Sequence, residues 1–323
     1  MITYKKKALT YAEQVLLLAN RGLGFEDVPR AERYLSEISY YRLSAYYLPF
    51  CGSKDSFKEG ATFEQVLDLY LFDRELRLIV FDAIERIEVT LKAQIIYRLA
   101  HKYNDSHWQD NAAIFNTPYT NSRTGKTTYI YQETQDIIKR HIDAKYPEVF
   151  VKHYISKYNE PSNPPSWMSI ELLTIGELSR LYQALRNNMD KQVIADFFNL
   201  HHTVFESWLH TLVYVRNICA HHARLWNRDF AIKPDVIKKP GLPWIDIAFN
   251  NNNHRCFYFL SLLKYLLISA NPGNHFKDHL SALFVKYPEV PIAYMGIPSI
   301  DGSVLFDWEQ QPVWKYYFLN SSH

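Results

Sequence analysis

Apolar residues recur at helical spacing along most of this chain. The clearest case is the segment 62–100, which no proline or glycine interrupts and whose apolar positions step by three and four: Leu69, Phe72, Leu76, Ile79, Ala83 and Ile87. Thr62 and Gln65 have the spacing of a capping box, so we expect the helix to begin there. At 1.5 Å per residue a continuous helix would be roughly 57 Å long. The pattern predicts one long helix with a buried stripe, bent or broken at most once.

Charged residues four positions apart accompany this stripe. The pairs are Asp73 with Arg77, Asp82 with Arg86, and Glu88 with Lys92. Opposite charges at this spacing lie on one helix face, so we expect solvated ion pairs beside the buried stripe. Glu85 and Glu88 also share a face, as a catalytic carboxylate pair would, but this arrangement is more typical of a solvated surface.

The rest of the chain predicts an all-α fold. Helical periodicity indicates further helices over 132–145, 191–199, 204–224, 252–269 and 276–286, and a helix capped by Ser166 or Ser169. The polar stretch 104–131 predicts a long loop or short hairpin. We therefore expect an N-terminal helical region with the long helix (1–103), a loop-rich insertion with a helix (104–165), a helical bundle (166–270), and a C-terminal helix with an irregular aromatic tail packed on the bundle (271–323).

Composition narrows the class of protein. With 47% hydrophobic and 22% charged residues the chain is globular rather than disordered. Its formal net charge of +2 means that any attraction to nucleic acid must come from local patches. The three cysteines are odd in number and lack Cys-x-x-Cys spacing, which disfavours disulfides and a thiolate zinc site. The first residues do not have the pattern expected of a secretory signal, and the longest apolar run, 257–270, is too short to span a bilayer. We expect a cytoplasmic protein.

The stretch VRNICAHHARLWNR, residues 215–228, carries the candidate chemistry. If the predicted helix continues to its end, five side chains fall within an arc of roughly 80° on a helical wheel: Tyr214, Asn217, His221, Arg224 and Arg228. His222 then faces the apolar side. Arg216 lies about 140° away from His221 on a straight helix. For these two to act together, the helix must be distorted or a second copy of the chain must complete the site.

These residue types suit cleavage of an RNA phosphodiester. Histidine moves protons near neutral pH, and arginine stabilises charge on the phosphate, so no metal or cofactor is needed. Asn217 would orient the imidazole of His221 or bind phosphate, and Tyr214 or Trp226 would stack on bases or simply pack in the core. A polar seam paired with carboxylates of other helices explains the same residues without catalysis. The other histidines, His201, His202 and His210, form no His-Glu-x-x-His pair with them, which disfavours zinc.

The sequence also resembles a known family. Arg216, Asn217 and His221 match the Arg-x4–6-His signature of HEPN domains, which are helical bundles, and His222 fits the same spacing. Five blocks in order resemble the Abi-like (AbiD/AbiF) family of bacterial abortive-infection proteins: SYYRLSAYYLPF, LYLFDRELRLIVFDAIERIEVTLK, PPSWMSIELLTIGELSRLY, VRNICAHHARLWNR and MGIP. The resemblance implies a HEPN-like bundle and an antiphage role through RNA cleavage or another RNA-directed toxicity.

By the same resemblance, Arg216, Asn217 and His221 are the catalytic candidates. HEPN nucleases bring two motifs together and this chain has one, so a nuclease would be a homodimer. The alternative is a protein that holds a small structured non-coding RNA without cleaving it, a role that a monomer could also perform. An interaction scaffold is the third option. The expected nucleic-acid contacts are Tyr214, His222, Arg224, Arg228, Arg42, Lys5, Lys6 and Lys7.

Overall fold

The computed structural model describes residues 7–53, 56–116, 118–120, 125, 127–299 and 305–316. Its helices confirm the all-α prediction: α1 (Tyr11–Asn20), α2 (Val28–Ile38), α3 (Tyr40–Ser44), α4 (Phe63–Tyr103), α5 (Ile130–Ile142), α6 (Val149–Lys157), α7 (Ser166–Ser169), α8 (Ile175–Ala184), α9 (Asn188–Ala195), α10 (His202–Ala220), α11 (Cys256–Ala270), α12 (Phe276–Lys286) and α13 (Pro312–Lys315). The described strands form two short antiparallel hairpins, β1 (Cys51–Ser53) with β2 (Ser56–Phe57) and β3 (Tyr119–Thr120) with β4 (Thr127–Thr128).

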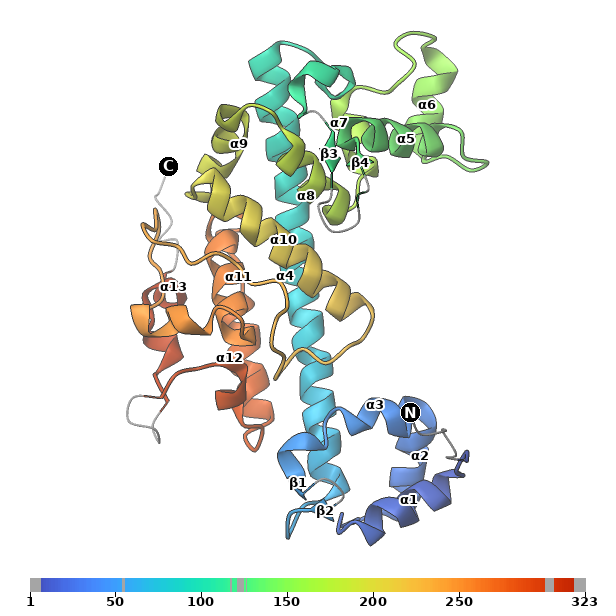
Figure 1. Cartoon of the computed structure of the whole chain (residues 1–323), viewed down its shortest axis with the longest axis vertical. Helices are drawn as coiled ribbons and strands as arrows, with labels where there is room; N and C mark the ends of the chain where they lie inside the picture. The colour runs from blue at the N-terminus through green and yellow to red at the C-terminus, as the bar shows by residue number, and fades with distance from the viewer. Residues whose placement is uncertain are drawn as a thin grey trace.

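Helix α4 is the central element of the fold (Figure 1). It contains 41 residues without a break, and Thr62 and Gln65 form the predicted capping box at its start. It ends where Asn104 takes a left-handed conformation, φ 47°, which an asparagine adopts more readily than most residues. The buried stripe of α4 packs against α9, α10, α11 and α12. The helix therefore extends from one end of the molecule to the other.

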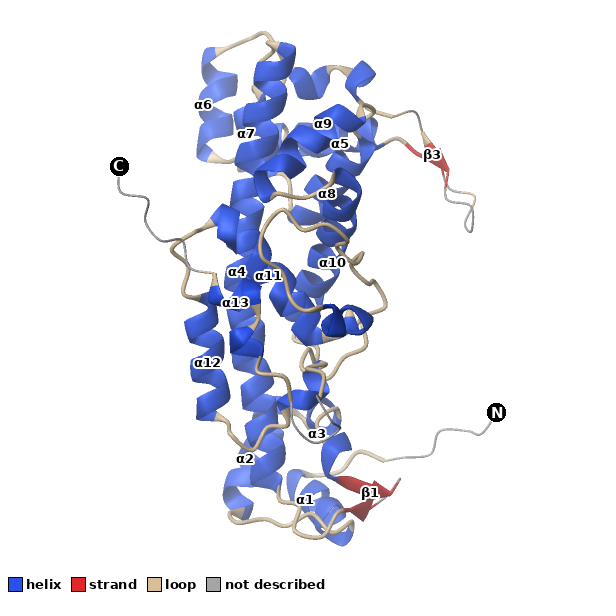
Figure 2. Ribbon diagram, turned by 90° about the vertical axis from the view of Figure 1, so that its left-hand side faces the viewer, coloured by secondary structure: helices blue, strands red, loops and turns tan. Residues whose placement is uncertain are grey.

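The N-terminal unit, α1 to α3 with the β1–β2 hairpin, packs around the first turns of α4 (Figures 1 and 2). Phe25 stacks on Phe63 with ring centroids 5.5 Å apart, and Tyr46 meets Tyr70 edge to face at 5.4 Å. Tyr46 and Leu43 are fully buried. Burial of these side chains fixes α3 beside the start of α4.

The other helices form a bundle along the upper part of α4, and the C-terminal region packs onto it. Helix α11 is buried along nearly its whole length. Trp308 and Trp314 lie 5.9 and 5.8 Å from the ring of Phe257 on α11. This is the aromatic tail that the sequence predicts. Among the described residues, no helix combines the length and the apolar character that crossing a membrane requires.

Three local expectations are wrong, and one helix was not expected. Asp73 and Arg77 are not a solvated pair, because their side chains are 0% and 6% exposed. The helix predicted over 204–224 ends at Ala220, and α6 was not predicted. The helix after the second loop is split into α7 and α8, and Thr174 rather than a serine caps α8, in a capping box with Glu177. The short element α7 begins after Pro165 with no side-chain cap.

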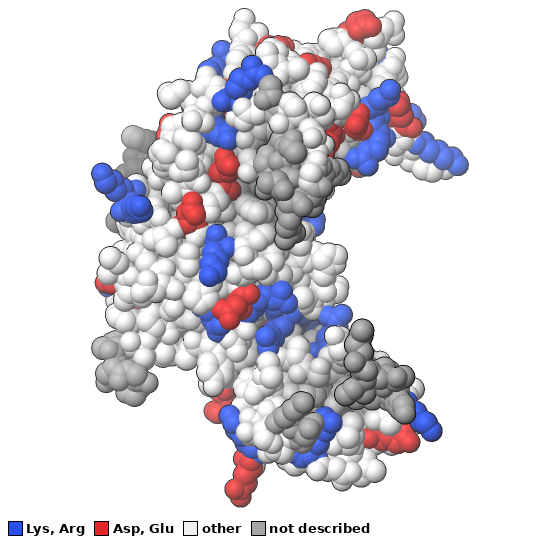
Figure 3. Space-filling view, in the orientation of Figure 1, with Lys and Arg blue, Asp and Glu red and all other residues white. Residues whose placement is uncertain are grey.

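The molecule is hollowed on one side (Figure 3). The N-terminal unit lies below this hollow and the end that carries α5 and α6 lies above it, while the C-terminal end of α10 reaches toward it from the middle (Figure 1). Lys and Arg side chains gather on the surface near the segment that follows α10 (Figure 3). The stretch 215–228 is therefore at the base of a concave, locally basic face.

Candidate functional site

Helix α10 ends between the arginine and the two histidines. His221 is the C-cap residue, with φ −88° and ψ 10°, and its amide donates to the carbonyl of Asn217. The next two amides turn back into the helix: His222 N–H to Cys219 O and Ala223 N–H to Ile218 O, both 3.0 Å. This pair of bonds is a Schellman motif, which satisfies the last carbonyls of a helix. The chain after His221 thus leaves the helical path.

The position of His222 corrects the prediction that it faces the core. Its φ is 55°, a left-handed conformation that histidine adopts more often than most residues other than glycine. The residue is exposed. The helical wheel placed His222 on the apolar face because it assumed a helix through Arg224, and the Schellman turn directs the side chain outward instead.

His221 and Asn217 occupy the exposed side of the last helical turn. Both are exposed, and within the described part of the chain no hydrogen bond or ion pair engages the ring of His221. The opposite side of α10 is buried through Val215, Ile218 and Cys219. A packed helix therefore holds a free imidazole at its end, next to an amide side chain one turn earlier.

Arg216 is half-buried against α4. Its guanidinium lies over the ring of Phe81, 5.9 Å from the centroid, and its Nη1 donates to Asn217 Oδ1 at 3.4 Å. No carboxylate of the described residues lies within ion-pair distance of it. The arginine thus keeps donors for an anion, and Asn217 connects it to the side of the helix that carries His221.

The predicted stripe of Asn217, His221, Arg224 and Arg228 is wrong beyond the helix end. Arg224 donates from Nη1 to the carbonyl of Ala45 at 2.8 Å, and Arg228 donates from Nε to the carbonyl of Arg224 at 2.8 Å. Both arginines follow Ala220, where the helix has ended. Their bonds shape the loop, and a contact of either with nucleic acid stays a prediction.

The other residues predicted to contact nucleic acid differ in their burial and in their hydrogen bonds. Arg42 is half-buried and donates to the carbonyl of His222 at 2.6 Å. Tyr214 packs on Phe230 at 5.9 Å, and its hydroxyl accepts from the amide of Ala231 at 3.4 Å. Trp226 is fully buried, so it packs in the core and does not stack on bases. Lys7 is exposed, whereas Lys5 and Lys6 lie outside the described residues.

Asp73 is the residue of this region that the sequence reasoning missed. Its carboxylate, fully buried on α4, accepts the amide of Leu225 at 3.1 Å and that of Trp226 at 2.7 Å. It also accepts from Tyr46 Oη at 2.6 Å and Arg77 Nη1 at 2.5 Å. A signal was present, because a helical wheel places Asp73 on the same side of α4 as the apolar residues Val80, Ile84 and Leu91. An acid at such a position requires buried donors.

A second anchor holds the far side of the same loop. Arg255, the residue before α11, donates to Asn227 Oδ1 and lies 3.3 Å from Asp229 Oδ1. Gly296 packs directly on Arg255: it has φ 96°, and a Cβ there would lie 2.3 Å from the Cβ of Arg255. The glycine of the MGIP block thus gives Arg255 the space to reach the loop.

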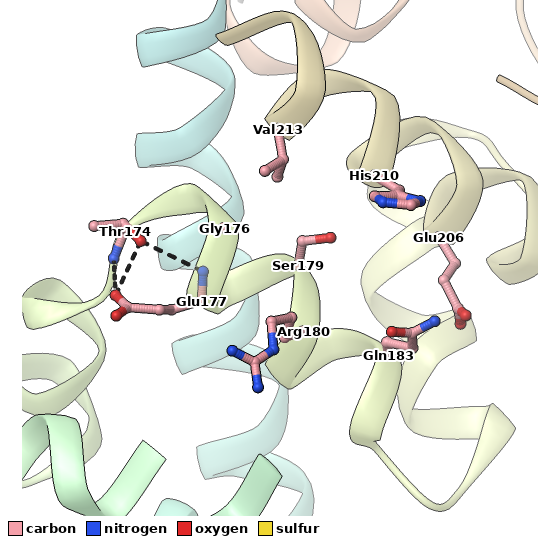
Figure 4. A pocket seen from close by; sticks show the side chains of 9 residues that line it. All are labelled: Thr174, Gly176, Glu177, Ser179, Arg180, Gln183, Glu206, His210 and Val213. Carbon is pink, nitrogen blue, oxygen red and sulfur yellow. Dashed lines mark hydrogen bonds between the residues drawn. The ribbon is translucent and has the colours of Figure 1, made fainter. Parts of the chain in front are cut away.

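A cavity of about 370 Å³, lined mostly by residues with polar side chains, opens between α8 and α10 (Figure 4). His210 and Glu206 project into it from α10, facing Ser179, Arg180 and Gln183 of α8. Two of its charges are already paired, since Arg180 contacts Glu133, and Glu206 lies 2.9 Å from Lys191. His210 lies about two turns before Asn217 on the same face of α10. The cavity is therefore an extension of the surface that carries the motif.

The described residues contain no group of three histidine, cysteine, aspartate or glutamate side chains arranged to hold a metal ion. At the end of α10, an exposed imidazole is chemically able to transfer protons, and an arginine is chemically able to bind an anion.

Residues 33–227 match the family model described as Abi-like protein. No curated protein and no solved structure matches the chain. The matched range contains α3, Asp73 and Arg77 on α4, the cavity between α8 and α10, and the stretch 215–227.

Proposed function

This chain belongs to the Abi-like protein family, and on that basis we propose that it acts in phage defence as a metal-independent endoribonuclease of the HEPN type. The family itself links the chain to abortive infection. The proposal of RNA cleavage rests on the residues at the end of α10. Its strongest support is that the ring of His221 is exposed, one turn from Asn217, and has no hydrogen-bond or ion-pair partner among the described residues. Arg216, which donates to Asn217, forms no ion pair with a carboxylate of the described residues.

Each residue has a role in the proposed reaction. The imidazole of His221 accepts the proton of the attacking 2′-hydroxyl or donates one to the leaving oxygen. Arg216 stabilises the charge of the phosphate in the transition state. Asn217, bonded to Arg216, orients that guanidinium or binds phosphate. In the hollow of Figure 3, the nearby basic side chains attract the RNA backbone through local charge, which the small net charge of the chain does not provide.

The test is cleavage of RNA in the presence of EDTA by the full chain. We expect His221→Ala and Arg216→Ala each to lower kcat by at least about 100-fold, the range for loss of a proton-transfer or charge-stabilising group. His153→Ala is a matched control, because His153 is an exposed histidine on α6. Unchanged cleavage after both substitutions at the α10 terminus would place the reaction elsewhere.

A homodimer completes the proposed site. One chain carries one motif, and α4 exposes three apolar side chains: Leu78 at 57%, Phe81 at 40% and Val89 at 56% exposure. Of these, Phe81 lies under the guanidinium of Arg216. These three lie on one side of α4, so a second copy docked there would bring two motifs close to each other. We expect a dimer in light scattering, and a monomer with little cleavage for Leu78→Asp. Full cleavage by a monomer would exclude the composite site.

The alternative is a protein that holds a structured small RNA without cutting it. The same hollow and the same arginines support this function. It predicts copurified RNA with strong absorbance at 260 nm, and an affinity that falls steeply with salt in proportion to the phosphates bound. In that case, His221→Ala changes RNA affinity but no cleavage is found in the wild type.

A further inference from the structure

The backbone after the two histidines depends on one buried side chain. The amides of Leu225 and Trp226 lie in an irregular segment, where no helix or sheet supplies an acceptor. Both donate to the carboxylate of Asp73, at distances of 3.1 and 2.7 Å to Oδ1. A buried amide without an acceptor is costly, so the place of this carboxylate determines where the chain runs three residues after His222.

The Asp73 side chain is surrounded by hydrogen-bond donors. Four donors reach it: the amides of Leu225 and Trp226, the hydroxyl of Tyr46 and the guanidinium of Arg77. Arg77 balances its charge at the next turn of α4. Burial raises the pKa of the Asp73 carboxyl, while Arg77 and the hydrogen bonds oppose that rise. Burying this carboxyl costs desolvation free energy, which the four hydrogen-bond donors offset.

A second set of bonds holds the same backbone nearer to the histidines. Arg42 of α3 donates to the carbonyl of His222 at 2.6 Å, and Arg224 donates in the opposite direction to the carbonyl of Ala45, just after α3, at 2.8 Å. Asp73 connects this loop with the segment after α3, because it also accepts a hydrogen bond from the hydroxyl of Tyr46, the residue after Ala45. The backbone from Ala220 to Trp226 is thus fixed at both ends, while the histidine side chains stay exposed.

We propose that Asp73 is a positioning residue for His221, acting through the backbone of residues 222–226 rather than by contact with RNA. This inference rests on the function proposed above. A proton-transfer group must be held within a fraction of an ångström of its productive position. The exposed ring of His221 makes no hydrogen bond or ion pair with the described residues that would hold it there. The buried carboxylate of Asp73 supplies that constraint by fixing the backbone that follows the two histidines.

Two double variants separate positioning from stability. Asp73→Asn with Arg77→Gln removes both charges but keeps an oxygen that accepts the two amides. Asp73→Leu with Arg77→Leu removes the acceptor as well, and such apolar replacement of a buried ion pair often preserves stability. We expect the first variant to cleave RNA within about threefold of the wild type, and the second to lose on the order of 100-fold in kcat with KM nearly unchanged.

Asp190→Asn is the matched control. Asp190 is another fully buried carboxylate, paired with Lys102 and hydrogen-bonded by Tyr103 far along α4 from Asp73. We expect its loss to lower the melting temperature and leave kcat unchanged. If the double leucine variant keeps the wild-type kcat, or if the Asn/Gln variant loses as much as the leucine variant, Asp73 does not position the site.

Amide hydrogen exchange in the unmodified full chain tests the same inference without cleavage. We expect the amides of Leu225 and Trp226 to exchange as slowly as those of the core helices, and those of Asn227 and Asp229 to exchange faster. Exchange of Leu225 and Trp226 at the rate of an exposed loop would overturn the proposal, even if the leucine variant does not fold. If the wild type cleaves no RNA, the proposed nuclease function fails, and the exchange result still decides whether Asp73 holds this backbone.

Discussion

Helix α4 takes part in a buried carboxylate contact near each of its ends, and the two contacts differ in what they hold. Near the N-terminal end, Asp73 belongs to α4 itself and accepts the backbone amides of Leu225 and Trp226. These amides lie in a loop with no regular hydrogen bonding. The carboxylate there accepts the hydrogen bonds that backbone carbonyls would accept in a helix or sheet.

Near the other end, α4 supplies the hydrogen-bond donors and another helix supplies the carboxylate. Lys102 and Tyr103 of α4 donate to Asp190, which belongs to α9, a helix whose own backbone is already hydrogen-bonded. That contact fastens one helix to another and determines no backbone path. Equal burial of two carboxylates therefore does not imply an equal role. Asp190 fixes the packing of two helices, whereas Asp73 fixes the course of the chain just after the candidate histidines.

The strongest test of this difference is Asp73→Ala. It leaves the Arg77 charge and two amides without a partner in a buried environment, so we expect a loss of about 3–5 kcal/mol in the free energy of unfolding. Urea unfolding followed by circular dichroism measures it. A loss below about 1 kcal/mol would mean that water or a rearranged loop replaces the carboxylate.

Asp190→Ala is expected to cost less, about 1–3 kcal/mol, because its partner Lys102 is 36% exposed and can turn to solvent. The same urea titration measures this loss. Equal losses at the two positions would break the distinction between a contact that fixes packing and one that fixes backbone.

Arg224→Ala tests the part of the anchor that involves α3. It removes the bond to the carbonyl of Ala45, and the half-exposed arginine is expected to contribute about 1 kcal/mol. Arg228→Ala, which removes a bond within the loop, is the comparison. Faster amide exchange around α3 in the Arg224 variant alone would show that the loop and the N-terminal unit stabilise each other.

His222→Gly gives the smallest effect and the opposite sign. Glycine tolerates φ near 55° without the penalty that a Cβ brings, and its greater freedom in the unfolded chain offsets part of the gain, so we expect stabilisation of about 0.5–1 kcal/mol. Thermal unfolding measures it. RNA cleavage retained in this variant would assign proton transfer to His221; a loss of cleavage would assign a role to His222.

The long helix was predictable and the geometry of the site was not. Helix α4 follows from an uninterrupted apolar period and a capping box, both of which are local signals. The end of α10 has no such signal: residues 221–224 lack glycine and proline, and a histidine occupies the left-handed position where glycine is usual. Hence the stripe through Arg228 was wrong, although Asn217 and His221 do share the exposed side of the helix.

The role of Asp73 depends on contacts that no periodicity contains. Its partners Leu225 and Trp226 are about 150 positions away in the chain and donate through their backbone, so their side chains give no indication of the bond. The four-residue spacing to Arg77 suggested a surface pair, and only the neighbouring apolar positions pointed to burial. A buried ion pair can therefore be told from a surface pair only when the fold is known.

The continuity of α4 has a consequence for any attempt to divide the protein into separately folding parts. Ile87, Leu91 and Ile95 of α4 are fully buried, in the part of the helix that packs on α9, α10 and α11. A fragment that begins at α7 would expose the surfaces that these residues cover, and a fragment that ends with α4 would expose the residues themselves. Truncation boundaries placed between 63 and 103 would therefore expose apolar surface on both fragments, and separable functions are better sought by point substitution than by dissection.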